Sequence, residues 1–154
     1  MNQTANPPSS VFSDRATGEV FPDARAMVNA YITRLNERSG AHHGALDDTG
    51  HVAIKRGSAN VSLSVLDDHG VLLLVAPIMN VPLLRREEFY RRLLELSFIA
   101  TSDAAFAIDG EKHEVCVRAL RRLSGLDYEE FEDLVETVGK VADDWDEALT
   151  REFG

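Results

Sequence analysis

The chain has 154 residues, of which 44% are hydrophobic and 27% charged, and its formal net charge is −10. This length suits one domain with a core of its own. No apolar run approaches the roughly 20 residues that cross a bilayer, the opening MNQTANPPSS lacks the features of a secretion signal, and the single cysteine, Cys116, has no partner for a disulfide. We therefore expect a cytoplasmic protein with no membrane partner.

The negative charge is concentrated near the C-terminus. Residues 127–152 hold 11 acidic and 2 basic side chains, a net charge of −9 that accounts for almost all of the excess. Such a segment repels a phosphate backbone. We therefore expect no direct contact with nucleic acid through this face, and a solvated helix surface is the simpler interpretation.

The first 20 residues are rich in Asn, Pro, Ser and Thr. They contain too few large apolar groups to offset the entropy lost on ordering, so they predict a mobile N-terminal tail. Phe12 and Val20-Phe21 are exceptions that could dock locally. Residues 21–154 then form a single domain.

A first helix is predicted after Pro22, with Asp23 as its N-cap and Ser39-Gly40 as its stop. Its apolar residues recur at helical spacing and form one stripe: Met27, Val28, Tyr31, Ile32 and Leu35.

The apolar period then changes from 3.6 to 2, which predicts strands at residues 51–56 and from residue 59 onward. A polar loop at 67–70 leads into a third strand, 71–78, whose side chains are apolar on both faces. A strand that is apolar on both sides needs cover on both sides. Helices of the same chain can cover one face, and a second subunit is the simplest cover for the other.

A second helix is expected at about 84–98, followed by a hairpin of strands 104–108 and 114–121 with its turn at Asp109-Gly110. The last helix begins with Asp127 as N-cap and Glu130 three residues later, a pattern like a capping box. The predicted fold class is α+β: a twisted antiparallel sheet packed with helices in the order α-β-β-β-α-β-β-α.

Catalytic signatures are missing from the sequence: it has no phosphate-binding loop, no dinucleotide-binding glycine motif, no nucleophile elbow and no zinc-protease helix motif. Adjacent His42 and His43, with Asp47 nearby, are the best candidates for a metal. Adjacent residues rarely aim at one ion without further ligands, and zinc takes four ligands or three and a water. We therefore predict no enzyme, no cofactor and no metal.

Three stretches of the chain resemble the YbjN family and the related class I type III secretion chaperones. They are Val71-Leu-Leu-Leu-Val-Ala-Pro-Ile with Val81-Pro82, Phe106-Ala-Ile-Asp-Gly with Glu114-Val-Cys-Val-Arg, and Gly125-Leu-Asp-Tyr-Glu-Glu-Phe with Val138-Gly-Lys-Val-Ala-Asp-Asp-Trp. The resemblance covers about residues 23–153. It implies a bacterial homodimer without a catalytic site that binds an extended segment of a client protein.

The sequence therefore predicts a non-enzymatic chaperone or adaptor that acts as a homodimer on a client protein. Two alternatives stay open: a small metal-using enzyme at His42, His43 and Asp47, and an accessory factor in nucleic-acid metabolism that works through a protein client. The residues predicted to bind the client are Met27, Tyr31, Leu35, Val52, Ile54 and Lys55. The residues predicted at the dimer interface are Leu72, Leu74, Phe89, Leu93 and Leu96.

Overall fold

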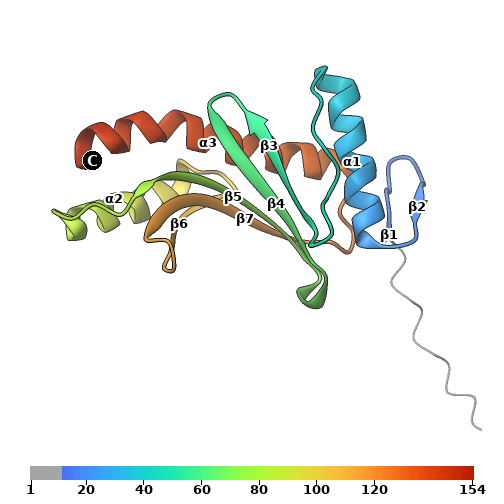
Figure 1. Cartoon of the computed structure of the whole chain (residues 1–154), viewed down its shortest axis with the longest axis horizontal. Coiled ribbons are helices and arrows are strands. Elements are labelled where there is room, and N and C mark those ends of the chain that lie inside the picture. Colours follow the sequence, from blue (N-terminus) through green and yellow to red (C-terminus); the bar gives the residue numbers. More distant parts are fainter. Residues whose placement is uncertain (1–11) are drawn as a thin grey trace, which may run out of the picture.

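A computed structural model of the chain describes residues 12–154 and shows three helices with a five-stranded antiparallel sheet (Figure 1). The elements in chain order are β1 (Phe12–Ser13), β2 (Val20–Phe21), α1 (Ala24–Ser39), β3 (His51–Arg56), β4 (Ala59–Leu66), a 3₁₀ turn (Asp67–His69), β5 (Val71–Asn80), α2 (Arg86–Ile99), β6 (Ala105–Asp109), β7 (Glu114–Arg122) and α3 (Tyr128–Phe153). The predicted fold class is confirmed, with a small hairpin added before the first helix.

That hairpin lies within the segment predicted as a mobile tail. Strands β1 and β2 pair antiparallel, with Phe12 opposite Phe21. Phe21 is buried, and its ring meets that of Tyr31 edge-to-face at 5.8 Å between centroids. The described part of the predicted tail, residues 12–20, therefore contributes to a hairpin beside α1, and residues 1–11 lie outside the described part of the chain.

The helix ends follow the predicted local chemistry. The side chain of Asp23 accepts a hydrogen bond from the amide of Ala26, and Gly40 ends α1 in the left-handed region at φ 72°. Asp127 caps α3 in the same way by accepting from the amide of Glu130. These caps satisfy amides and carbonyls that the helices leave unpaired at their ends.

The main sheet has the strand order β3-β4-β5-β7-β6, so β3 and β6 are its two edges. Strands β4, β5 and β7 each alternate side chains between two faces. Leu63 of β4 lies opposite Leu74 of β5, which lies opposite Ala119 of β7, and all three are buried on one face. Helix α3 crosses this face, and α1 packs near the N-terminal end of α3 (Figure 1). We call this the helix-covered face of the sheet.

Helix α2 packs beside the C-terminal end of α3. Phe89, Leu93 and Leu96 share a buried cluster with Leu149 and Phe153. Arg85, which precedes α2 at φ 57°, reinforces this contact: its guanidinium donates to the carbonyl of Glu152 at 3.0 Å and lies 4.8 Å from the Phe153 ring centroid. The start of α2 is therefore joined to the end of the chain.

Candidate partner-binding surfaces

The first-helix residues predicted to meet a client lie in the core. Met27, Tyr31 and Leu35 are 2% exposed or less. The Tyr31 ring packs 5.7 Å from that of Phe131, and its hydroxyl donates to the carbonyl of Leu126 at 2.8 Å. Burial raises the pKa of Tyr31 well above its usual value. A client could reach these side chains only if α1 moved away from α3 and the β1–β2 hairpin.

The remaining predicted client-binding residues lie on β3. Ile54 is fully buried, Val52 is half-buried, and Lys55 is exposed. Because β3 is an edge strand, one row of its backbone groups has no strand partner among residues 12–154. The structure thus leaves Lys55, Val52 and the β3 backbone as the accessible part of the predicted site.

Contacts with α3 hold the β3–β4 turn in place. Arg56 forms an ion pair with Glu136, and the Asp143 carboxylate accepts hydrogen bonds from the Ser58 hydroxyl and from the Ser58 amide, the latter at 3.1 Å. These hydrogen bonds from Ser58 lower the pKa of Asp143. The edge strand is therefore presented on a fixed support, as strand addition by a partner requires.

The residues predicted at the dimer interface are buried within one subunit. Leu72 and Leu74 lie on the helix-covered face of β5 and are completely buried, and Phe89, Leu93 and Leu96 are at most 7% exposed. The chain itself covers these side chains. A second copy is therefore not needed to bury them.

The opposite side of α2 carries a second apolar stripe that nothing in the described residues covers. Tyr90, Leu94 and Phe98 recur every four residues and so lie on one face of the helix. Leu94 is 74% exposed and Phe98 88% exposed. Large exposed apolar patches of this kind mark interaction sites. The sequence contained this signal, because α2 has two apolar stripes, but the spacing alone did not show which one faces outward. We call these three residues the α2 outer stripe.

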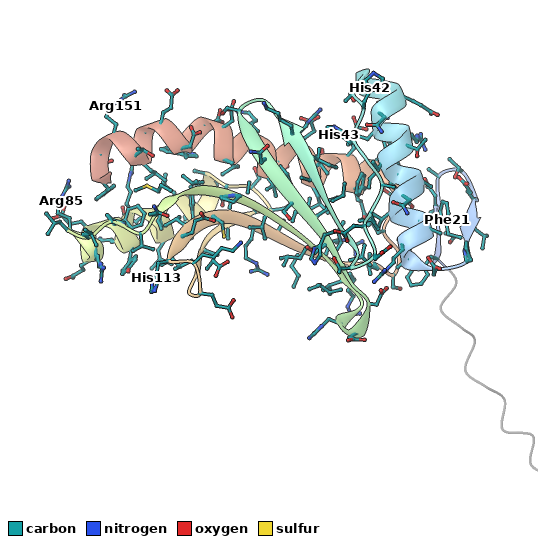
Figure 2. All side chains as sticks on the ribbon, in the orientation of Figure 1. Phe21, His42, His43, Arg85, His113 and Arg151 are labelled. Atoms are coloured by element: carbon teal, nitrogen blue, oxygen red, sulfur yellow. The ribbon has the colours of Figure 1, made fainter. Side chains whose placement is uncertain are left out.

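The histidine pair proposed as a metal site, His42 and His43, lies at one end of the molecule (Figure 2) and is held by hydrogen bonds to Asn36. His42 and His43 lie beside the C-terminal end of α1, far from Arg85 at the other end of the molecule (Figure 2). The Asn36 side chain donates to the His43 carbonyl and accepts from its amide, both at 2.9 Å. Burial lowers the pKa of His43.

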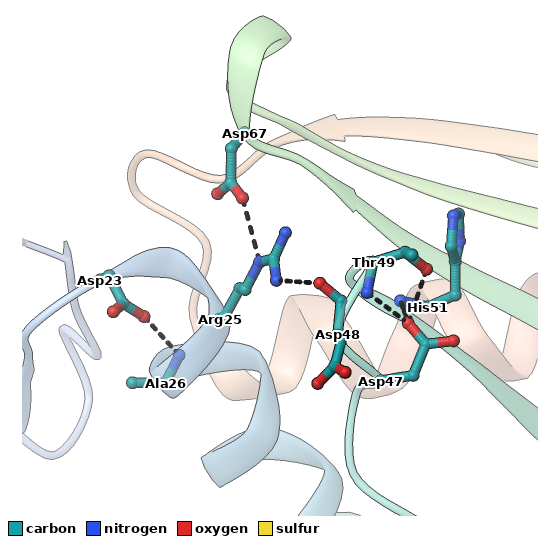
Figure 3. A network of polar contacts seen from close by, with 8 residues as sticks. All are labelled: Asp23, Arg25, Ala26, Asp47, Asp48, Thr49, His51 and Asp67. Atoms are coloured by element: carbon teal, nitrogen blue, oxygen red, sulfur yellow. Dashed lines mark hydrogen bonds and ion pairs between the residues drawn. The ribbon is translucent and has the colours of Figure 1, made fainter.

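Asp47 orders the loop that leads into β3. Its carboxylate accepts hydrogen bonds from the amides of His51 and Thr49 and from the Thr49 hydroxyl (Figure 3). These bonds, chiefly that from the His51 amide, lower the pKa of Asp47. Across residues 12–154, no three His, Cys, Asp or Glu side chains are grouped as a metal would require.

Comparison with known proteins identifies the family of this chain. The model of the Tir chaperone protein (CesT) family matches residues 31–146. The chain belongs to the CesT family. In this CesT-family chain, no helix of residues 12–154 is both long enough and apolar enough to cross a bilayer. No curated protein matches the sequence.

Solved structures support the CesT assignment at the level of the fold. The ExsC–ExsE complex contains a chain that is 24% identical, with a TM-score of 0.68, over 82% of this chain and 96% of that one. The HopA1–SchA chaperone–effector complex matches at 13% identity and a TM-score of 0.60, over 79% and 97%. The ExoU–SpcU complex of the Pseudomonas aeruginosa type III secretion system matches at 14% and 0.60, over 78% and 95%.

The resemblance to type III secretion chaperones is therefore confirmed at the level of the family and the fold, whereas the match to YbjN is only a distant structural one. The structure of YbjN from E. coli is 14% identical, with a TM-score of only 0.49. CesT-family membership and the chaperone–effector complexes among the similar structures support a protein-binding chaperone. The family takes its description from a chaperone, the Tir chaperone protein.

Proposed function

We propose that this CesT-family chain is a non-enzymatic chaperone that binds a client protein as a homodimer in the bacterial cytoplasm. The observation that carries the proposal is the α2 outer stripe, whose Leu94 and Phe98 are among the most exposed large apolar side chains of residues 12–154. Obligate interfaces are apolar in this way, like a protein core divided in two.

A second copy of the chain fits this stripe because the stripe is self-complementary. Suppose that the α2 helices of two copies pack antiparallel, with the two-fold axis between their Leu94 side chains. Each Tyr90 then faces the Phe98 of the other copy, since both residues lie four positions from Leu94. The same axis brings Arg91 within about 3 Å along the helix axis of the other copy's Glu95. Opposite charges then meet at the rim of an apolar contact.

The edge strand β3 is the proposed place where the client docks. An extended client segment that pairs with β3 would satisfy its free backbone groups, and Lys55 and Val52 would contact the client side chains. Met27, Tyr31, Leu35 and Ile54 are buried in the core and would not touch the client. The dimer would present two such edges.

The homodimer is tested by light scattering coupled to size exclusion. The wild type should have twice the 17.0 kDa chain mass. Leu94→Asp should give the monomer mass, because it places a charge in the centre of the α2 outer stripe. Val20→Asp is the matched control, since Val20 is 62% exposed on β2, and it should stay dimeric. A monomeric wild type, or a dimeric Leu94→Asp variant, would refute this dimer.

Client binding is tested with a purified pair. The tagged chain is used to capture partners from cells of its source, the partners are identified by mass spectrometry, and the purified partner is titrated in a calorimeter. Direct binding that Lys55→Glu weakens, while melting and dimer mass stay unchanged, is the expected result. If no captured protein binds directly once purified, the chaperone proposal fails.

A further inference from the structure

The face of the sheet opposite the helices carries an apolar strip along β5 and β7. The strand register places Val71 beside Arg122, Leu73 beside Leu120, and Val75 beside Arg118. These residues alternate with the buried Leu72, Leu74 and Ala119 and therefore point away from the helices. We call this side the open face.

The strip is accessible from solvent. Leu120 is 50% exposed, and Val71, Leu73 and Val75 are half-buried between their neighbours, whereas the side chains next to them on the helix-covered face are almost completely buried. The strip spans residues 71 to 75, about 13 Å at the usual rise of a strand. This length corresponds to roughly two and a half turns of an α-helix.

Positive charge lies along one border of this strip. Arg118 and Arg122 make no ion pair within residues 12–154. In contrast, Arg121 points to the helix-covered face and pairs with Glu130 at 2.6 Å. Two guanidinium groups without an ion pair therefore lie beside the exposed aliphatic side chains of the strip.

The other border of the strip is polar and neutral. Ser64 lies opposite Leu73, and Ser62 lies opposite Val75, both on β4. On the strands of this face the carboxylates, Asp109 and Glu114, are at the far end beside the β6–β7 turn. Asp67 and Asp68 lie in the turn between β4 and β5 at the other end, and Asp67 pairs with Arg25. The strip therefore has a positive side and a neutral side.

We infer that the open face binds an acidic amphipathic helix of the client, with the apolar stripe of that helix on Val71, Leu73, Val75 and Leu120. Carboxylates on one flank of the helix would meet Arg118 and Arg122. The inference rests on the proposed function, because the segment is taken to be part of the client. The docking site is separate from β3, so the client would contact the chaperone at two places.

Charge argues against the other occupants of this face. A second copy packed by two-fold symmetry would add two more unpaired arginines to the interface and no carboxylate within the strip to pair with them, and unpaired like charges in an interface are unfavourable. A nucleic acid would use the arginines and leave the aliphatic strip exposed. An acidic amphipathic helix is the partner that uses both features.

The test uses a fluorescein-labelled helical peptide of about fifteen residues, roughly four turns, with a leucine stripe flanked by glutamates. A twin peptide carries lysines in place of the glutamates. Fluorescence anisotropy should show that the acidic peptide binds the wild type and the twin binds more weakly. The double variant Arg118→Glu/Arg122→Glu should weaken binding of the acidic peptide by about tenfold or more and should reverse the preference.

Two further variants make the test specific. Leu120→Ser should weaken the binding of both peptides, because it removes apolar contact without changing the charge of the face. Arg151→Glu, at an exposed position on α3, should leave both affinities unchanged, and circular dichroism should show native folding for every variant. Equal binding of the two peptides by the wild type, or wild-type affinity in the double variant, would overturn the inference.

The remaining outcomes assign the face to another occupant and also overturn the inference. If Leu120→Ser gives an assembly of lower mass than the wild type, the face is a contact between copies. If the wild type binds a labelled DNA duplex tightly and the double variant does not, the face binds nucleic acid. The proposed function is judged separately from the purified client. If the client binds the double variant and the wild type equally, the chaperone function stands and the open-face site does not.

Discussion

Gly139 of α3 lies directly against Arg56 of β3. A methyl group at Gly139 would lie 2.7 Å from the Cβ of Arg56, closer than two carbon atoms can pack. The helix and the edge strand approach each other here only because residue 139 has no side chain. This contact lies beside the β3–β4 turn, which is also joined to α3 by the ion pair of Arg56 with Glu136 and by the hydrogen bonds of Ser58 to Asp143.

Gly139→Ala should therefore destabilise the protein, although alanine is the better helix former. The helix itself would gain about 1 kcal/mol, whereas overpacking at the Arg56 contact costs about 1–3 kcal/mol. Urea denaturation measures the balance. In an Arg56→Gly background the same substitution should become stabilising by about 1 kcal/mol. A stabilising effect in the wild-type background would contradict the close contact.

Tyr31→Phe should lower the free energy of unfolding by about 0.5–1.5 kcal/mol, since it removes the hydrogen bond to the Leu126 carbonyl and leaves that carbonyl without its partner. Tyr90→Phe is the control when both substitutions are made in the monomeric Leu94→Asp background, because Tyr90 is 36% exposed on the single subunit and its hydroxyl can reach water. Chemical denaturation of the two variants at equal protein concentration measures the difference. Equal stability of the two would mean that the Tyr31 hydroxyl contributes nothing.

Asp143→Asn should lower the melting temperature at pH 7 and have a progressively smaller effect as the pH falls well below the ordinary carboxyl pKa. Hydrogen bonds from Ser58 lower the pKa of Asp143 in the folded chain. Its contribution is therefore complete above the ordinary carboxyl pKa of about 3.9 and is lost as the pH falls through the lower folded value. Asp144→Asn is the control, because Asp144 makes only a surface ion pair with Lys140. If the difference in melting temperature between the wild type and Asp143→Asn stayed unchanged down to pH 2, ionisation of Asp143 would be ruled out as its cause.

Phe131→Ala should cost about 3–5 kcal/mol, because its ring is completely buried under α3. Leu134→Ala, on the same helix, should cost less, since Leu134 is only partly buried at the margin of the core. Urea denaturation of both variants measures the two losses in the free energy of unfolding. If the two variants were equally stable, α3 would not pack through the face that the structure shows.

Local features of the sequence were sufficient to predict most of the elements. The change of apolar period separates α1 from β3, and the caps at Asp23 and Asp127 form as expected because capping depends on residues three positions apart. The pairing of residues 12–13 with residues 20–21 was not predicted, although Phe12 and Val20-Phe21 were expected to be able to dock locally, because two-residue strands carry no periodic signal. In the structure the ring of Phe21 meets that of Tyr31.

The candidate surfaces depended on the tertiary structure. The two apolar stripes of α2 have the same helical spacing, and only packing against Leu149 and Phe153 decides that Leu93 is inside and Leu94 outside. Strand β5 is apolar on both sides, and only its register with β4 and β7 decides which leucines the helices cover. The sequence by itself determined the elements, because their signals lie within a few residues. Which of two equivalent apolar faces remains for a partner was decided by contacts between residues far apart in the chain.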